Sequence, residues 1–377
     1  MCLGDYKICV YAICKNEEKF VDRWMDSVKE ADLVVVLDTG STDNTVEKLK
    51  ERGAVVYEEV INPWRFDEAR NRALSHVPDD MEICVSIDLD EIHEPGWRDV
   101  LESEWKPEYT RVTYPYIWSH HDDGRPDQKY IREKIHRRHD FHWVRPVHEV
   151  LQYTGEGTEK ELWIEKLVLH HYPDVTKPRS QYLPLLELSV KENPLDDRAT
   201  FWLGREYMYY QKFELAIETL KQYLNIPTAM WKEERSAAMR FIAQSYDWLQ
   251  NSSEAMAWHL RAVNECPTER EPYLPLAKLA YRQNNWAQVF STVQLALAIP
   301  TKSTSYLMEP DCWGADFYDL GSISAYYLGL YEKALEYGQE AIAKRPGDER
   351  LQLNLELFQK KIQEQAQKDS ELTQEQV

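Results

Sequence analysis

Three short apolar runs near the start of the chain constrain its fold most, because each has the length of one buried strand. They cover residues 8–13, 33–37 and 83–87. The last run leads directly into Asp88 and Asp90, whose side chains share one side of an extended chain. Clustered carboxylates repel one another unless a divalent cation such as Mg²⁺ neutralises them. The sequence therefore predicts a cation and ligand site where this strand leaves its sheet, with a solvated acidic turn as the alternative.

Strand and helix patterns alternate from residue 7 to residue 91. After the first run, apolar residues repeat at the spacing of one helix face: Phe20, Val21, Trp24, Met25 and Val28. Residues 54–57 are predicted to form a further strand, and residues 67–74 a further helix. This order predicts an α/β domain with a doubly wound, mostly parallel sheet.

Four motifs lie along this α/β segment in a characteristic order. They are Asn16-Glu17, the loop Asp38-Thr39-Gly40-Ser41-Thr42-Asp43, Ala69-Arg70-Asn71 and Asp88-Leu89-Asp90. In these motifs the chain resembles family 2 glycosyltransferases of the inverting, nucleotide-sugar-dependent kind, whose fold is called GT-A. One position departs from the family pattern, since residue 39 is Thr where Asp is usual. The resemblance covers roughly the first 90 residues and implies a glycosyltransferase domain over residues 1–176.

The resemblance implies a nucleotide site at the ends of the first two strands. Asp38 and Glu17 would bond the uracil and ribose of a uridine diphosphate (UDP) sugar, and Arg70 would lie near the base or phosphates. Plain turn chemistry is the alternative for Asp38, because Gly40 permits a bend there.

The resemblance also implies a metal site that takes Mn²⁺ or Mg²⁺. Asp90 would be a direct ligand, and Asp88 would contact the ribose or a metal-bound water. A third ligand is expected near residues 167–172, where His171 fits the family slightly better than His170. A histidine packed beneath a strand or helix is the alternative.

A local basic cluster follows in an otherwise acidic chain. It comprises Arg125, Lys129, Arg132, Lys134, Arg137 and Arg138. A diphosphate leaving group is stabilised by such charge, and Arg137 and Arg138 are predicted to bind the donor. A solvated face that pairs with nearby carboxylates is the alternative.

Residues 142–151 resemble a His-Glu segment of the glycosyltransferase branch that carries tetratricopeptide repeats. By this resemblance Glu149 is the predicted catalytic base, since inverting transfer needs a carboxylate that accepts the acceptor's proton. Alternatively, Glu149 is an ordinary strand residue or orients His148.

From residue 177 to about 362 the pattern is that of paired helices. Small and aromatic residues recur in the register of tetratricopeptide repeats, as at Gly204, Tyr207 and Ala216, and a four-unit array with a final amphipathic helix is predicted. These are expected to be packing positions, and such arrays form surfaces that bind peptides or partner chains. Residues 363–377 are polar and are predicted to be disordered.

Charge and composition exclude several classes of protein. The net charge of −20 and a pI near 5.1 disfavour binding along nucleic acid or on an anionic membrane. No run of eighteen apolar residues and no secretion signal is present, so the expected location is cytoplasmic. The six cysteines lack metal-type spacing and are expected to be reduced thiols, while the oligomeric state stays open.

The expected function is metal-dependent, inverting transfer of a sugar from a UDP-sugar. A peptide or protein acceptor is favoured, because bacteriocin peptide S-glycosyltransferases pair similar domains. A saccharide, a lipid-linked acceptor or a modified DNA base remains an alternative. A non-catalytic scaffold and a nucleotidyltransferase are rivals from other classes, although the latter normally has a glycine-rich first loop that this chain lacks.

Overall fold

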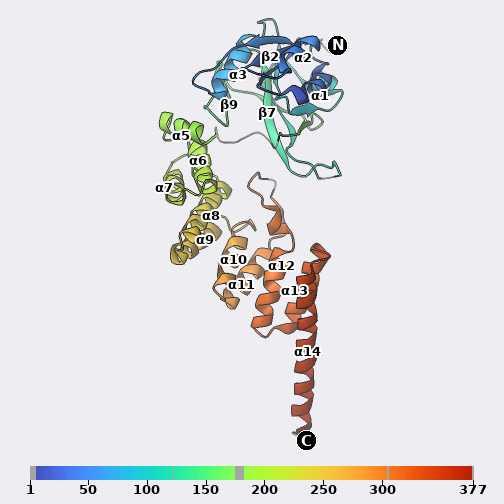
Figure 1. Cartoon of the computed structure of the whole chain (residues 1–377), viewed down its shortest axis with the longest axis vertical. Coiled ribbons are helices and arrows are strands. Elements are labelled where there is room, and N and C mark those ends of the chain that lie inside the picture. The colour runs from blue at the N-terminus through green and yellow to red at the C-terminus, as the bar shows by residue number, and fades with distance from the viewer. Residues whose placement is uncertain (1–5, 122, 175–181, 304, 376–377) are drawn as a thin grey trace. The chain divides into compact units, whose positions relative to one another are not determined.

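The computed structural model describes residues 6–121, 123–174, 182–303 and 305–375. The chain divides into two compact units, Met1–Asn193 and Pro194–Val377, coloured blue to green and green to red in Figure 1. The predicted boundary at residue 176 lies outside the described residues. Helix α5 (Tyr182–Glu192), which was expected to open the helical domain, belongs to the first unit. Its Tyr182 ring contacts the Phe66 ring of the same unit, with centroids 6.2 Å apart.

The first unit alternates strands and helices up to β4, as predicted, and then continues mainly as strands. Its elements before α5 are β1 (Ile8–Cys14), α1 (Glu18–Val28), β2 (Leu33–Asp38), α2 (Thr45–Glu51), β3 (Val55–Glu58), α3 (Phe66–Ser75), β4 (Ile83–Ser86), β5 (Glu91–His93), α4 (Trp97–Glu104), β6 (Arg111–Ile117), β7 (Lys129–Arg137), β8 (Phe141–Val144), β9 (Val150–Tyr153), β10 (Glu161–Trp163) and β11 (Leu169–His171).

The strands of this unit form one large mixed sheet and one small hairpin. The order in the large sheet is β3-β2-β1-β4-β7-β6-β11-β5, with β10 paired to β6, and β8 pairs with β9. Strands β1 to β4 are parallel where they pair, whereas β7 is antiparallel to both β4 and β6. The prediction of an α/β unit with a mostly parallel sheet is therefore confirmed, with antiparallel strands added beyond β4.

Burial on both faces of the sheet explains the unbroken apolar runs. Along β1, Val10 and Ala12 face a core that includes Trp24 of α1. The intervening Tyr11 faces the opposite core, together with Leu74 of α3. Helices on both faces leave the strand ends as the place where polar side chains meet.

The parallel register aligns the carboxyl ends of the central strands. Cys14 at the end of β1 pairs with Asp38 at the end of β2, and Tyr11 pairs with Ser86 at the end of β4. The loops that carry Asp38 and Asp88 therefore leave the sheet at the same edge.

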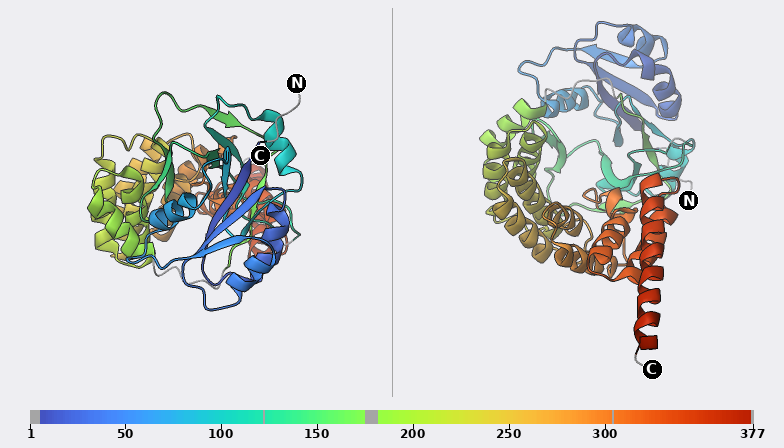
Figure 2. Two further views of the ribbon diagram at one scale, coloured as in Figure 1. Left: turned by 90° about the horizontal axis from the view of Figure 1, so that it is seen from above. Right: turned by 60° about the horizontal axis from the view of Figure 1, so that its bottom comes forward.

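The second unit consists of consecutive helices that pack against their neighbours in sequence (Figures 1 and 2). They are α6 (Asp197–Tyr209), α7 (Phe213–Leu224), α8 (Lys232–Trp248), α9 (Ser252–Glu265), α10 (Tyr273–Arg282), α11 (Trp286–Leu297), the short helix η1 (Pro310–Trp313), α12 (Asp316–Tyr327), α13 (Tyr331–Lys344) and α14 (Glu349–Glu375). The predicted array corresponds to the pairs α6–α7, α8–α9, α10–α11 and α12–α13, followed by α14.

The predicted packing positions of the repeats are buried in the structure. Ala216, Ala255 and Ala334 have no exposed surface. At Gly204, a Cβ atom would lie 2.5 Å from the Leu220 side chain, so a larger residue would push the paired helices apart. These residues therefore serve packing alone.

The prediction of a disordered tail from residue 363 is wrong. Helix α14 continues to Glu375. The tail is rich in Gln, Glu and Lys, which favour a helix once a preceding helix supplies its nucleus. Lys361 also pairs with Glu364 at 2.7 Å, one turn along.

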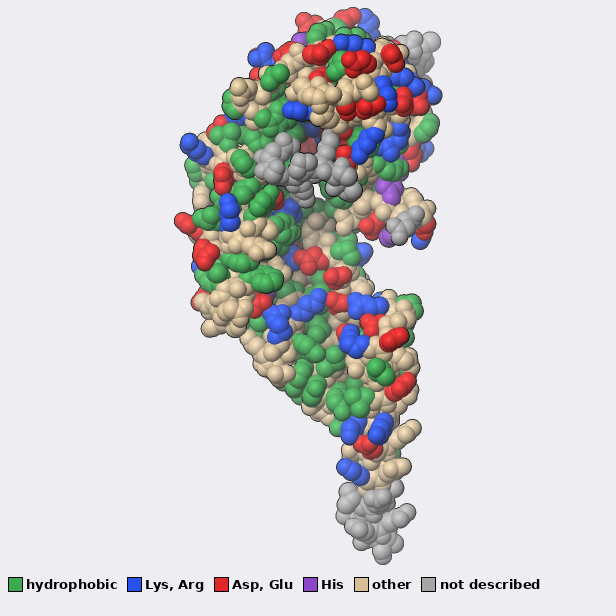
Figure 3. Space-filling view, in the orientation of Figure 1, with side chains coloured by type: hydrophobic (Ala, Val, Ile, Leu, Met, Phe, Trp, Pro, Cys, Tyr) green, Lys and Arg blue, Asp and Glu red, His purple; other side chains and the backbone are tan. Residues whose placement is uncertain are grey.

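Surface and cysteine features agree with the composition. On the face shown in Figure 3, acidic and basic side chains are intermingled over both units. Among the described residues, no helix is long and apolar enough to cross a membrane. Five cysteines lie in the described part of the chain, at positions 9, 14, 84, 266 and 312, and all are buried free thiols, as expected.

Candidate functional site

The loops after β1 and β2 are tied together by hydrogen bonds. Asp38 is buried, and its Oδ2 atom accepts the backbone N–H groups of Gly40 and Ser41, each at 2.9 Å. Gly40 has φ of +105°, which residues with a side chain rarely adopt. The backbone N–H of Glu17 donates to the Thr45 hydroxyl at 2.8 Å. The structure thus places Glu17 and Asp38 at adjacent strand ends and shows Asp38 shaping its own loop, while their contact with a nucleotide stays a prediction.

Ion pairs near the end of β4 join helix α3 to the loop after β4 and to the loop before β9. The Arg70 guanidinium, on α3, contacts Asp88 through Nη1–Oδ1 at 2.9 Å and Nη2–Oδ2 at 3.1 Å. Its Nε atom donates to Glu149 Oε1 at 2.5 Å. The guanidinium also lies over the Trp143 ring, 5.0 Å from its centroid. Arg70 is only 4% exposed, so it holds two carboxylates together in a largely dehydrated place.

The charges of this group shift one another's pKa values. Burial alone would raise the pKa of Glu149, but attraction to Arg70 and Lys134 outweighs burial, and the pKa lies below its ordinary value. For Asp88 the same balance holds, and its pKa is also lowered, while the pKa of Arg70 is raised. Both carboxylates are therefore ionised at neutral pH.

The lowered pKa of Glu149 predicts a pH-dependent contribution to stability. This contribution is complete above the ordinary value of 4.5 and is lost as the pH falls through the lower folded-state value. Glu149→Gln, which keeps an acceptor for Arg70 but removes the charge, should lower the free energy of unfolding by about 1 kcal/mol at pH 7. This penalty should shrink below pH 4.5, as measured by urea unfolding of both proteins. A penalty that stays constant into acid would contradict the ion pair.

Lys134 completes the charge balance around Asp88. Its Nζ atom lies 2.9 Å from Asp88 Oδ2 and 3.7 Å from Glu91 Oε2. Glu91 is buried and also accepts the Tyr116 hydroxyl at 2.8 Å and the backbone N–H of Asp88 at 3.0 Å. Glu91 thus orients this corner of the site. The sequence put Lys134 in the basic cluster without a role of its own, because its place beside Asp88 depends on the register of β7.

The structure does not bring Arg137 and Arg138 to this site, which corrects their predicted role in donor binding. In the antiparallel pairing, Arg137 lies opposite Ile83 at the start of β4, whereas Asp88 follows its end. Arg137 pairs with Asp140 at 2.5 Å, and Arg138 Nη2 donates to the Val77 carbonyl at 2.7 Å. Both arginines therefore brace loops at the opposite edge of the sheet.

Asp90 and His171 meet beside the ion-pair group. His171 Nε2 lies 3.5 Å from Asp90 Oδ2, and the pairing of β11 with β5 puts His171 opposite Glu91. The other ring nitrogen, Nδ1, lies 3.2 Å from the Trp118 carbonyl, so an N–H there directs Nε2 toward Asp90. The Trp118 ring stacks on His171 with centroids 4.5 Å apart.

His170 faces elsewhere. Its ring nitrogens lie 3.1 Å from Glu94 Oε1 and 2.9 Å from His120 Nε2. His171 is therefore the histidine that could act with Asp90. Within the described ranges, no group of three or more His, Cys, Asp or Glu side chains is arranged to hold a metal ion by itself.

Asn71 of the Ala-Arg-Asn motif links α3 to β8 through hydrogen bonds to the Trp143 backbone. Its side-chain amide donates to the Trp143 carbonyl and accepts the Trp143 backbone N–H, both at 2.8 Å. The indole N–H of Trp143 in turn donates to the Tyr11 hydroxyl at 2.9 Å. This network holds α3 against β8 and so fixes the ring beneath Arg70, a role that sequence analysis missed.

Comparisons with known proteins agree with this architecture. Residues 9–161 match the family model described as Glycosyl transferase family 2. An uncharacterized glycosyltransferase of Rickettsia bellii is 30% identical over 125 residues, which are 32% of this chain and 41% of that protein. A TPR repeat-containing protein of Synechococcus elongatus is 26% identical over 152 residues, which are 40% of this chain and 36% of that protein. The chain thus spans about two fifths of the length of these curated relatives.

Solved structures also align with the chain at low similarity. MamA has a TM-score of 0.37 and 16% identity, over 48% of this chain and 99% of that one. YrrB, described as a TPR protein with an unusual peptide-binding site, has a TM-score of 0.35 and 17% identity, over 47% of this chain and 82% of that one. The family model and the sheet with its strand-end motifs agree: residues 9–161 are similar to the domain of glycosyl transferase family 2.

Proposed function

We propose that the chain is a metal-dependent, inverting glycosyltransferase that moves a sugar from a nucleotide diphosphate donor, with UDP-sugar favoured, to an acceptor. The observation that carries this proposal is the meeting of Asp88, Arg70 and Glu149, from two loops and one helix, at the carboxyl edge of a family 2 domain. Buried charged groups at a strand-end edge are typical of catalytic sites.

Asp90 and His171 fit a divalent cation as two of its ligands. Their facing atoms are 3.5 Å apart, and two bonds of about 2.1 Å can reach a common point between them. Because only two protein ligands converge, the remaining positions would suit diphosphate oxygens and water, as Mn²⁺ and Mg²⁺ prefer. When bound, the ion supplies charge neutralisation for the leaving diphosphate.

Glu149 is assigned as the base. In the proposed step, the acceptor oxygen or sulfur attacks the anomeric carbon, its proton passes to Glu149, and the bond to the diphosphate breaks. The lowered pKa keeps Glu149 ionised at neutral pH, so it is ready to accept the proton. Arg70 holds Oε1, and the other oxygen is assigned to the proton.

Lys134 and Arg70 are assigned to the charge that develops on the leaving group. Both contact Asp88, and both come from elements packed against β4 or the adjacent strand β1. Positive side chains held in this way need little reorganisation when negative charge appears beside them.

The first test is calorimetric titration of UDP into the full chain, with Mn²⁺ and then with a chelator. Saturable binding that needs Mn²⁺ is the expected result. Binding of guanosine or cytidine diphosphate alone would replace UDP in the donor assignment. No nucleotide binding in either condition would favour the scaffold alternative.

Asp90→Ala should weaken Mn²⁺-dependent UDP binding by at least about tenfold, since one charge-bearing ligand is removed. Asp99→Ala, at an exposed position in the first turn of α4, is the matched control and should bind UDP as the parent chain does. Circular dichroism checks that both variants fold. Unchanged Mn²⁺ dependence in Asp90→Ala would remove the metal assignment.

For the acceptor we propose a peptide or protein. The support is the combination of a family 2 domain with an all-helical array, which resembles peptide S-glycosyltransferases in its sequence pattern. Mass spectrometry of Cys-containing and Ser-containing peptides, incubated with the chain and UDP-sugars, would detect the mass of one hexose or N-acetylhexosamine. Transfer to free saccharides or lipid-linked acceptors alone would overturn this choice.

A further inference from the structure

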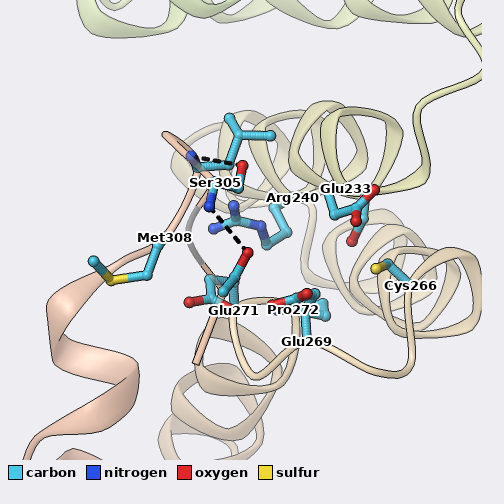
Figure 4. Close-up of a pocket in the computed structure, with 11 residues that line it drawn as sticks. Glu233, Arg240, Cys266, Glu269, Glu271, Pro272, Ser305 and Met308 are labelled. Carbon is cyan, nitrogen blue, oxygen red and sulfur yellow. Dashed lines mark hydrogen bonds between the residues drawn. The ribbon is translucent and has the colours of Figure 1, made fainter. Parts of the chain in front are cut away.

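A small pocket lies within the second unit, and all of its lining residues belong to that unit. Its walls come from α8, from the connection between α9 and α10, and from the segment that precedes η1 (Figure 4). Its lining includes Glu233, Arg240, Glu269 and Glu271. The cavity has a volume of about 20 Å³, which is room for one water-sized group.

Glu271 brings an unsatisfied polar atom to this pocket. It is only 5% exposed. Its Oε1 atom accepts the backbone N–H of Glu309 at 3.3 Å and the indole N–H of Trp313 at 3.1 Å. Its Oε2 atom is buried and has no hydrogen-bond partner in the described part of the chain. A buried carboxylate oxygen without a donor is costly, so a donor from a ligand would be stabilising.

The pocket also carries an excess of negative charge. Glu233, Glu269 and Glu271 line it, and no ion pair of these three is found among the described residues. Arg240, the cation in the wall, already pairs with Glu309. Burial, followed by repulsion from Glu271 and Glu233, raises the pKa of Glu269. The carboxylates in the pocket wall therefore repel one another, and a bound cation would reduce this repulsion.

We propose that this pocket binds a primary ammonium group, as carried by a lysine side chain, a polypeptide N-terminus or a small amine. An ammonium offers three N–H donors to the unsatisfied oxygens of Glu271 and Glu269. Its size matches the cavity, whereas a planar guanidinium is larger. The lining contains no aromatic ring, which disfavours a quaternary ammonium cage.

A metal ion is the poorer occupant. The carboxylates of this pocket do not form a group that could hold a metal, as judged over the described ranges. The proposal is also independent of the transferase assignment, because every residue that carries it lies between positions 233 and 313.

The test uses the full chain and three probes in calorimetric titration: the peptide acetyl-Gly-Lys-Gly-amide, its Nε-acetyl-lysine counterpart, and n-butylammonium. The lysine peptide should bind with a dissociation constant in the millimolar range or below, and the acetylated peptide should not bind up to about 10 mM. Glu269→Gln should weaken binding about tenfold, since a charge-assisted hydrogen bond is lost. Glu218→Gln, exposed on α7 and outside the pocket, removes the same charge and should leave binding unchanged.

The other possible results either identify the source of the ammonium group or overturn the proposal. Binding of both the lysine peptide and n-butylammonium supports an ammonium site, and binding of the amine alone supports it with a small-molecule source. Equal binding of the acetylated peptide, stronger binding of CaCl₂ than of either amine, or no binding of any probe would each overturn it. Glu269→Gln should unfold no earlier than the parent on heating, because it removes repulsion, so that lost binding cannot be attributed to misfolding.

Discussion

Glu149→Gln should slow sugar transfer by about 10³-fold and leave UDP binding within a factor of about two. The amide keeps an oxygen that can accept the Arg70 Nε–H, so the hydrogen bond that Glu149 Oε1 accepts at 2.5 Å is retained by the amide oxygen. What the amide lacks is basicity, and an attacking hydroxyl or thiol then has no carboxylate to take its proton. Single-turnover transfer and UDP titration on the same preparation separate these two effects.

The choice of substitution distinguishes a base from a positioning residue. If Glu149 merely holds Arg70, the amide serves equally well and transfer continues at the parent rate. If donor binding falls together with the rate, Glu149 belongs to the donor site and the base assignment is wrong. Glu161→Gln, exposed on β10, is the matched control and should show neither change.

The strand ends could be predicted because burial on both faces leaves a direct signature in sequence. A parallel strand covered by helices on each side reads as an unbroken apolar run, and the polar residue that ends it marks the edge of the sheet. This reasoning correctly located Asp38 and Asp88 at one edge. It also placed Asp90 near that edge, and the structure puts His171, the histidine favoured by the family resemblance, beside Asp90.

The basic cluster could not be resolved from sequence, because its geometry depends on the register of β7. That strand spans Lys129–Arg137, long enough to run from one edge of the sheet to the other. Lys134 and Arg137, only three residues apart, therefore face different surroundings, one beside Asp88 and the other beside Asp140. The register of β7 against β4 and β6 decides which of these residues reaches Asp88, and no register was assigned to this strand from the sequence.

The ion-pair partners of Arg70 could not be predicted from the sequence either. The resemblance implied that Arg70 lies near a nucleotide, but the structure pairs it with two carboxylates separated from it by long stretches of chain. In the helical unit, by contrast, the small residues at Gly204 and Ala216 could be placed correctly, because helix pairs recur at a fixed period and contact mainly their neighbours.

Arg70→Met should destabilise the first unit by about 3–5 kcal/mol, the largest stability change we expect from one substitution here. Arg70 is 4% exposed, and its guanidinium neutralises both Asp88 and Glu149. Without it, two carboxylates are left close together with Lys134 as the remaining cation at this group. Methionine retains apolar contact with the Trp143 ring. The loss of stability would therefore come from the missing positive charge rather than from lost packing.

Hydrogen exchange of peptides from α3 and β4 measures this loss locally, and peptides from α10 in the other unit serve as an internal reference. Arg72→Met, two residues along α3, is the matched control. Its side chain is 56% exposed and pairs with Glu68 one turn earlier, so its effect should be below about 1 kcal/mol.

Combining Arg70→Met with Glu149→Gln should recover part of the lost stability, because one unpaired charge is removed. If the double variant is as unstable as the sum of the two single variants, the carboxylates do not share Arg70, and the ion-pair group does not act as a unit.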